Sequence, residues 1–430
     1  MKLTRRSAAQ ATVAVLGISM LITGCVGADN SAGSDNGGDE PSGPLVLQNW
    51  RSGPELEALE AVVDQFNERG GLQVEINSVP VETYRVQLPS YLTQQDPPDI
   101  YTWLAGNATR AYADDGLLLD LSDVWTDEFA EPIDPALREL SQDSNGNEVF
   151  VPMNYYWSAV YYRPSIFEDL GVEPVDTWDD LMALAEDVQN QGVTPFGIGL
   201  SDAPWTASRW FDYLNLRING AEYHLELLAG EHSFADDEVR TVMETWGEAI
   251  PYFDQAALGT TRQQSITEFA QGQSAMYLGG SAVQDLVPED VADDLAFFQF
   301  PVVDPAVPVA EEGPTDGLFA SANTDQPEAV KEFMEYAGSA EAQETLITTL
   351  GGTQLPANSQ ADVDLPELAQ QGQDMLDSAD ALTQFFNRDG SDALQPTADT
   401  ALTRHFAGNG ELDDILAEWD SAAQQVFENQ

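Results

Sequence analysis

Between residues 45 and 103, apolar strand-like runs alternate with amphipathic stretches, and few folds are compatible with this alternation. Strands are expected at Leu45–Asn49, Leu72–Ile76 and Asp99–Trp103, which are short and either apolar or alternating in polarity. One helix with an apolar face starts at Pro54, and a second helix ends near Gln95. This order of strands and helices predicts an α/β fold with a mostly parallel sheet that helices cover on both faces.

The same alternation resumes after residue 176 and predicts a second α/β unit. Thr177 is expected to cap a helix, because Asp180 follows it at the spacing of a capping box and apolar residues then recur at helical spacing. Further helices are expected at 205–218, 238–250, 327–338, 340–350, 397–406 and 411–427, and strands at 194–200, 273–278 and 297–303. Two α/β lobes account for the pattern.

The charge of the chain excludes one class of partner. The formal net charge is −58, with 74 acidic residues against 16 lysines and arginines, and Lys331 is the only lysine after Lys2. Nucleic acid is excluded, because this surface could not neutralise phosphates. So many carboxylates favour adaptation to high salt, where self-repulsion is screened; a general acidic bias of a secreted protein is the alternative.

The first 25 residues indicate export. A basic start precedes an apolar run that is short for a membrane span and ends in small residues, which is typical of a signal peptide at 1–24. Residues 21–25 read Leu-Ile-Thr-Gly-Cys and resemble the bacterial lipobox, so Cys25, the single cysteine, is predicted to carry a lipid. Residues 25–44 would form a flexible linker. The protein is therefore expected on the outer face of the bacterial cell membrane, exported by the general secretory or the twin-arginine route.

No catalytic motif is visible. His224, His232 and His405 are far apart and lack metal-ligand spacing, and no nucleophile elbow, P-loop or dinucleotide fingerprint occurs. A pair of carboxylates suited to glycoside cleavage stays open, although chance pairs are common among so many acids. We therefore expect no enzyme activity, no catalytic residue, no metal and no cofactor.

The stretch 143–148, DSNGNE, has a partial likeness to a calcium-binding loop. Glu148 stands where such a loop requires glycine, and Asn154 where it requires its closing glutamate. A hairpin turn before a strand at 149–153 is the preferred interpretation.

The aromatic residues say more about the ligand than the motifs considered above. Trp50 and Trp103 each end a predicted strand, the edge where ligands bind in open α/β sheets, and Trp205 follows a proline at a helix start. Trp178 lies on an apolar helix face and is expected in the core. Sugar rings pack their C–H faces on aromatic planes, so an aromatic cleft edged with polar groups fits a neutral carbohydrate.

Four motifs, in order, resemble one family of receptors. They are DPPDIYTWLAGNATRAYADDGLLLDLSDV from residue 96, EVFVPMNYYWSAVYYRPSIFEDLGVEPVDTWDDL from 148, FAQGQSAMYLGGSA from 269 and PEAVKEFMEYAGSAEAQETLITTLGGTQLPAN from 327. The chain resembles, from about Leu45 to its end, the family 1 extracytoplasmic solute-binding proteins of ATP-driven carbohydrate importers, the maltose-binding-protein-like group.

The resemblance implies a two-lobed periplasmic-binding-protein fold of type II with a hinge between the lobes. The first lobe would comprise 45–152 and 312–352, and the second 153–311 and 353–430. Residues 152–162 would form the first crossing between them, with Tyr156 and Trp157 facing ligand or hinge. Such a receptor, expected as a monomer, closes on a mono- or oligosaccharide and presents it to a membrane permease.

The chain departs from the maltose binders of the family at two positions. Gly279-Gly280-Ser281-Ala282 offers no stacking tryptophan, and Tyr156 stands where an acidic residue is expected. These departures argue against maltodextrin as the ligand but remain compatible with another sugar. The candidate ligand-binding residues are Trp50, Arg51, Trp103, Asn107, Tyr155, Tyr156, Trp157, Trp205, Gly280, Asp316, Phe386 and Arg388, with Trp103 and Trp205 expected to clamp a sugar ring from opposite lobes.

Two other functions stay open at this point. A secreted sugar-cleaving enzyme could use the same aromatic cleft with two carboxylates at a suitable separation. A ferric-ion receptor on the same fold could use adjacent phenolates, such as Tyr155-Tyr156 or Tyr161-Tyr162.

Salt should stabilise this protein. Its uncompensated negative charges repel one another at low ionic strength, and the screening length falls from about 10 Å at 0.1 M to about 3 Å at 1 M. We expect the melting temperature, measured by calorimetry, to rise from low to molar salt. A flat or falling curve would contradict salt adaptation.

Overall fold

The computed structural model describes residues 43–429. The predicted signal peptide, Cys25 and nearly all of the predicted linker lie outside this range. Among the described residues, no helix is long and apolar enough to cross a membrane.

One sheet has six strands in the order β11-β4-β10-β3-β1-β2. Its strands are β1 (Leu45–Asn49), β2 (Val74–Ser78), β3 (Ile100–Leu104), β4 (Val151–Tyr155), β10 (Thr315–Ala320) and β11 (Leu355–Pro356). The three predicted N-terminal strands are confirmed and run parallel, but β10 is antiparallel to both β3 and β4. The prediction of a mostly parallel sheet is wrong here, because a strand from much later in the chain enters between β3 and β4.

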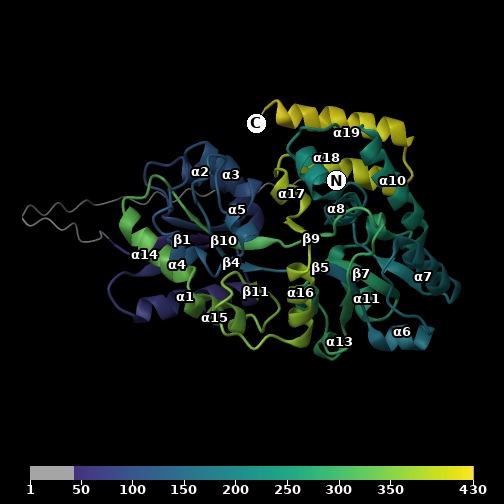
Figure 1. Ribbon diagram of the computed structural model, residues 1–430, viewed down its shortest axis with the longest axis horizontal. Helices are drawn as coiled ribbons and strands as arrows, with labels where there is room; N and C mark the ends of the chain where they lie inside the picture. The colour runs from purple at the N-terminus through teal and green to yellow at the C-terminus, as the bar shows by residue number, and fades with distance from the viewer. Residues whose placement is uncertain (1–42, 430) are drawn as a thin grey trace, which may run out of the picture. The chain divides into compact units, whose positions relative to one another are not determined.

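Helices cover both faces of this sheet, and together they form the first lobe. Helices α1 (Pro54–Glu68) and α15 (Ala340–Thr349) lie on one side, and α2 (Val81–Leu92) and α3 (Asn107–Asp114) on the other (Figure 1). The predicted apolar face of α1 is confirmed, since Leu59, Val62 and Phe66 are all buried. Burial of this stripe against the sheet is what holds the helix.

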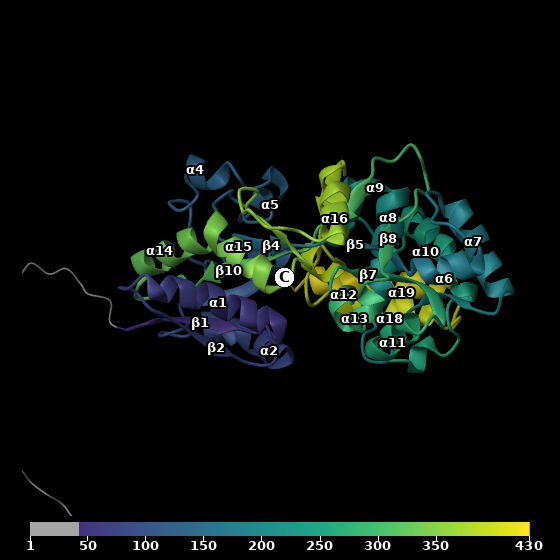
Figure 2. The ribbon, with the colours of Figure 1, turned by 90° about the horizontal axis from the view of Figure 1, so that it is seen from below.

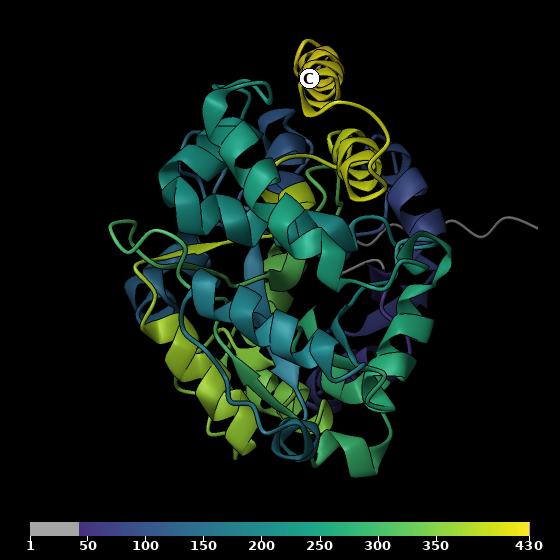
Figure 3. The same ribbon diagram turned by 90° about the vertical axis from the view of Figure 1, so that its right-hand side faces the viewer.

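A second sheet has four strands in the order β6-β7-β5-β8. Its strands are β5 (Ser158–Tyr162), β6 (Thr194–Gly197), β7 (Ser274–Gly280) and β8 (Ala296–Phe298). The sheet and its helices form the second lobe, whose main helices are α7 (Trp178–Asn190), α8 (Thr206–Ile218), α10 (Asp237–Ala249), α11 (Arg262–Ala270), α18 (Gln395–Phe406) and α19 (Leu412–Phe427). In Figure 3, α18 and α19 are the yellow helices at the upper edge. Thr177 caps α7 as predicted, accepting the Asp180 N–H.

The remaining elements are short or lie in connections. They are α4 (Asp127–Ala130), α5 (Pro135–Glu139), α6 (Pro164–Leu170), α9 (Gly220–Leu228), α12 (Val283–Leu286), α13 (Glu289–Ala292), α14 (Pro327–Ala337), α16 (Glu367–Asp377), α17 (Phe386–Asp389), β9 (Ala310–Glu312), β12 (Ala381–Thr383) and two 3-10 turns, Ile250–Tyr252 and Ala257–Gly259. The hairpin predicted at 143–148 is confirmed, since Gln142 and Glu148 pair across it.

Three connections join the lobes. The first is the crossing that was predicted at residues 152–162. It consists of β4 and β5, with Tyr156 and Trp157 between the two strands. The second runs from β9 to β10, and the third from β11 to α16, which lies between the two sheets (Figure 2). The assignment of 353–430 to the second lobe is wrong at its start, because β11 pairs with β4 in the first sheet.

Helix α16 packs so closely on the first connection that it requires glycine. A Cβ on Gly372 would lie 2.3 Å from the Trp157 ring, whereas one on Gly247 in α10 would have its nearest contact at 3.7 Å. Gly372→Ala should destabilise the fold by about 1–3 kcal/mol through overpacking. Gly247→Ala should be neutral or stabilise by up to about 1 kcal/mol, because alanine favours the helix. Urea unfolding of both variants measures this, and equal stability would contradict the packing.

Candidate functional site

A cavity of about 550 Å³ opens between α2 of the first lobe and the segment after β12 in the second. Arg85 and Val86 of α2 line one wall. The other lining residues belong to the first connection, the start of α8 and the segment 385–396: Tyr156, Trp205, Phe385, Asn387, Arg388, Asp392, Gln395 and Pro396. The volume is in the range of small-molecule sites, roughly 300–1,000 Å³.

Three aromatic rings line this cavity. Trp205 directly precedes α8 and is 38% exposed, which is unusual for so large a side chain. Tyr156 and Phe385 are half-buried, with ring centroids 6.0 Å apart. The Arg209 guanidinium lies 4.6 Å from the Phe385 centroid and 5.8 Å from that of Trp205. Flat rings with polar groups between them suit a ligand with apolar faces and polar edges.

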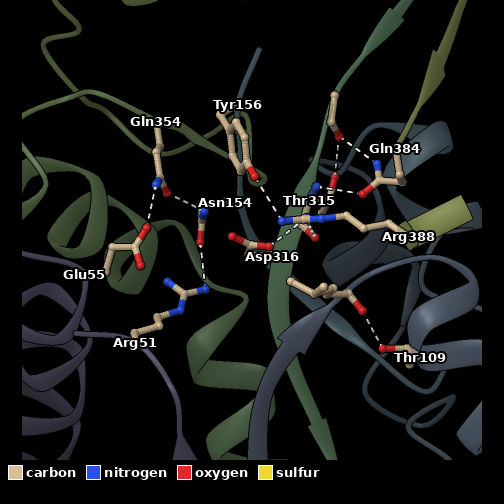
Figure 4. A network of polar contacts seen from close by, with 12 residues as sticks. Arg51, Glu55, Thr109, Asn154, Tyr156, Thr315, Asp316, Gln354, Gln384 and Arg388 are labelled. Carbon is tan, nitrogen blue, oxygen red and sulfur yellow. Dashed lines mark hydrogen bonds and ion pairs between the residues drawn. The ribbon is translucent and has the colours of Figure 1, made fainter. Parts of the chain in front are cut away.

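Arg388 connects the aromatic wall to the first sheet (Figure 4). Its Nη1 donates to the Thr315 carbonyl oxygen at 3.1 Å and to Asp316 Oδ1 at 2.8 Å, and its Nη2 donates to the Tyr156 hydroxyl at 3.0 Å. Burial raises the pKa of the Tyr156 phenol, which is therefore neutral and keeps its proton. This proton is free to be donated to an incoming acceptor.

A second polar group lies at the ends of β1 and β4. Arg51 Nη2 donates to Asn154 Oδ1 at 3.3 Å, and Asn154 Nδ2 donates to Gln354 Oε1 at 2.5 Å (Figure 4). Gln354 in turn donates to Glu55 at 3.4 Å. Burial raises the pKa of Glu55, and the Arg51 charge opposes this shift. These are hydrogen-bonding side chains at the carboxyl edge of the sheet, where ligands of α/β folds bind.

Buried carboxyl groups lie near Arg209 and Arg388: Glu312 and Asp212 interact with Arg209, and Asp389 with Arg388. Glu312 is the acid nearest to Arg209, at 3.7 Å, and neither oxygen of Glu312 has a hydrogen-bond partner among the described residues. Burial raises the pKa of Glu312 to about 8 and that of Asp389 to about 7, and raises the pKa of Asp212 well above its usual value. Desolvation therefore favours the neutral acids here.

Three of the predicted site residues line this cavity: Tyr156, Trp205 and Arg388. Asp316 lies next to them as the partner of Arg388. Gly280 is also adjacent, since a Cβ there would meet the Tyr156 ring at 3.4 Å. These five residues come from distant parts of the sequence and meet at one place.

Other predicted residues are placed elsewhere. Trp103 is 2% exposed and stacks on Tyr84, with ring centroids 5.6 Å apart, so the predicted clamp of Trp103 with Trp205 is wrong. Trp157 and Phe386 are fully buried in the core. Packing of these rings in the interior leaves no face for a ligand.

Four further predicted residues do not line the cavity. Trp50 is half-buried at the end of β1, and Arg51 belongs to the polar group described above. Asn107 donates through its amide to the Asp389 carbonyl oxygen and so ties α3 to α17. Tyr155 lines a different cavity, of about 540 Å³, with residues of α5 and α16.

The adjacent tyrosines of the ferric hypothesis do not converge. Tyr155 and Tyr156 line different cavities, and Tyr161 is buried with Tyr162 half-buried in the next strand. Within residues 43–429, no group of three or more His, Cys, Asp or Glu side chains could hold a metal ion. The geometry favours neither the ferric-ion receptor nor the sugar-cleaving enzyme.

The sequence interpretation missed Phe385 and the α2 wall. Phe385 is next to the predicted Phe386, and only the local backbone decides which ring is exposed. Val86 is 81% exposed although the buried residues of α2 are Tyr84, Leu88 and Leu92. The sequence signal for this wall was that Val86 lies outside the four-residue spacing of the residues that α2 buries.

Fold and site together define a two-lobed receptor for a small molecule. The model of the bacterial extracellular solute-binding protein family matches residues 52–344. The chain belongs to this family.

Relatives and solved structures agree with this assignment. The chain is 26% identical over 350 residues to an ABC transporter extracellular-binding protein of Pyrococcus horikoshii, covering 77% of this chain and 76% of that one. It is 26% identical over 370 residues to the alpha-glucosides-binding periplasmic protein AglE of Rhizobium meliloti, covering 80% and 78%. It superposes on the bacterial solute receptor AcbH, described as preferring β-D-galactopyranose, with a TM-score of 0.83, 25% identity and coverage of 89% and 99%.

The pKa of Asp389 predicts a pH dependence of stability. A folded-state pKa raised to about 7, from an ordinary value of about 3.9, means that the folded protein binds this proton more tightly than the unfolded chain. The stabilisation is present in acid and is lost as the pH rises from about 4 to 7. The asparagine of Asp389→Asn cannot titrate. The free energy of unfolding of this variant, measured with urea, should therefore fall less over this pH range than that of the parent. Parallel pH profiles of variant and parent would contradict the assignment.

Proposed function

We propose that this protein captures a mono- or oligosaccharide between its lobes and delivers it to the permease of an ABC importer, without catalysing a reaction. The observation that carries the proposal is the cavity whose walls combine Trp205, Phe385 and Tyr156 with the hydrogen-bonding group of Arg388, which is paired with the adjacent Asp316. Sugar-binding relatives such as AglE and AcbH support the ligand class.

The aromatic wall would hold the apolar faces of the sugar. Rings of Trp205 and Phe385 offer flat surfaces to C–H groups. Arg388 and Tyr156 would donate to hydroxyl oxygens, and Asp316 would accept from hydroxyl groups. The site thus selects a ligand with hydroxyls at its edge and an apolar face.

Closure would bring the first-lobe wall onto a ligand already seated on these rings. The lobes are joined by the residues between β4 and β5, by Gly313 and Pro314 between β9 and β10, and by the segment from β11 to α16. Changes of backbone angle at such points produce hinge bending. We propose the lobes as 45–152 with 312–352 and 153–311 with 353–430, with the strand at 355–356 moved to the first.

Membrane attachment would keep the receptor near its permease. We propose that the signal peptide is removed and that Cys25 is lipidated, so that the folded part is tethered at the outer face of the cell membrane as a monomer. One acyl chain binds only marginally, and stable anchoring takes more than one. No cofactor is needed for capture and delivery.

Loss of the exposed tryptophan tests the site. Trp205→Ala should weaken sugar binding by about 1–3 kcal/mol, the range for a central aromatic contact, and should change stability less, because the ring is partly exposed without ligand. Leu258→Ala is the matched control, since Leu258 is 43% exposed and does not line the cavity. Calorimetry and tryptophan fluorescence against a panel of mono- and oligosaccharides measure binding. If a folded protein binds none of them, the function is wrong; if Trp205→Ala binds as tightly as the parent, the site is wrong.

A further inference from the structure

The few arginines of this acidic chain gather at one place. Of the 16 lysines and arginines, 13 lie after residue 42. Arg85 and Arg388 line the cavity. Arg209 and Arg262 lie near the ring of Trp205, which lines it, and Arg51 belongs to the polar group at the ends of β1 and β4. This part of the molecule is therefore rich in cations for a chain whose net charge is −58.

Two of these arginines, Arg51 and Arg262, lack a carboxylate partner among the described residues, and a third, Arg209, has a distant one. Away from the cavity, every described lysine and arginine except Arg110 has a carboxylate oxygen within 4.0 Å. At the cavity, Arg85 and Arg388 are paired, each at 2.8 Å. Arg51 and Arg262 have no described carboxylate within 4.0 Å, and Arg209 approaches one only to 3.7 Å, without a hydrogen bond. In a chain with 74 acids, such arginines are unusual.

Two of them flank the exposed aromatic platform. The guanidinium carbons of Arg209 and Arg262 lie 5.8 Å and 5.7 Å from the Trp205 ring centroid. The Arg209 Nε–H is buried and has no partner among the described residues. A ring stacked on Trp205 would bring its substituents within reach of both guanidinium groups.

The nearest acid is a weak partner for Arg209, since it lies at 3.7 Å and makes no hydrogen bond to it. Burial also raises the pKa of Glu312, which favours its neutral form, whereas arginine stays charged. An unpaired charge in a partly buried site costs free energy unless a ligand supplies the opposite charge. A hydroxyl group would leave this cost in place, and a carboxylate would remove it.

We infer that the ligand of this cavity is a sugar acid, whose ring stacks on Trp205 and whose carboxylate binds between Arg209 and Arg262. This inference rests on the proposed function and replaces the neutral sugar expected from the sequence by a charged one. The negative surface repels such a ligand at long range, but beyond about 10 Å this repulsion is screened at 0.1 M salt. Close to Trp205, the two arginines act directly.

Matched pairs of sugars test the inference. Binding of glucose and glucuronate, and of galactose and galacturonate, is measured by titration calorimetry at 0.1 M and 1 M salt. The acidic member of at least one pair should bind about tenfold or more tighter than its neutral counterpart, in line with a charge-assisted hydrogen bond. This preference should shrink at high salt.

Arg262→Gln should remove most of the preference, because it should weaken binding of the acidic member more than binding of the neutral member. Arg262 is half-buried and its loss should be tolerated, which circular dichroism checks. Arg240→Gln is the control, because Arg240 is a half-buried arginine of the same lobe, paired with Asp413 away from the cavity.

The outcomes separate the two proposals. Equal or tighter binding of the neutral member in both pairs overturns the sugar-acid inference and leaves the sugar receptor standing. A preference that survives Arg262→Gln and Arg209→Gln unchanged also overturns it. Absence of binding to all four sugars overturns the inference, and absence of binding to the wider saccharide panel overturns the proposed function as well.

Discussion

The Arg388–Asp316 ion pair is the contact on which the arrangement of the site depends. Arg388 follows β12 near the second lobe, and Asp316 stands on β10 in the middle of the first sheet. Both side chains are buried, at a separation of 2.8 Å. Loss of either partner would leave a buried charge uncompensated, which costs several kcal/mol, on the order of 3–5. The pair therefore fixes the C-terminal segment against the sheet and orients the Tyr156 hydroxyl, which the same guanidinium binds.

Glutamine and asparagine side chains extend this tie to the other connections. Gln384 donates to the Gly313 carbonyl oxygen at 2.8 Å and accepts the Thr315 N–H at 2.9 Å. Asn107 reaches the Asp389 carbonyl oxygen from the first lobe. Segments 313–316 and 384–389 are thus joined by hydrogen bonds where the chain crosses between lobes. These hydrogen bonds hold the second connection and the segment that follows β12 together where they pass between the lobes.

The acidic composition gives this site its electrostatic character. On the exterior, the few cations are matched with carboxylates, as in the pairs Lys331–Asp123 and Arg404–Glu418. Such exposed pairs contribute little to stability. In the cavity, burial favours neutral acids while the arginines keep their charge. A protein that is strongly negative as a whole thereby holds a local region suited to an acceptor or an anion.

The sequence by itself determined the α/β class, the positions of most helices and strands, and the cap at Thr177, because hydrophobic period and capping are local properties. It also singled out Tyr156, Trp205 and Arg388, whose residue types fit a sugar site. Only the tertiary structure decided that Trp103 stacks inside on Tyr84, that Phe385 rather than Phe386 faces the cavity, and that β10 enters the first sheet antiparallel. The antiparallel entry of β10 depends on pairing between segments more than 200 residues apart. The placement of Trp103 and Phe385 depends on tertiary packing and on the turn of the backbone, and neither leaves a periodic signal in the sequence.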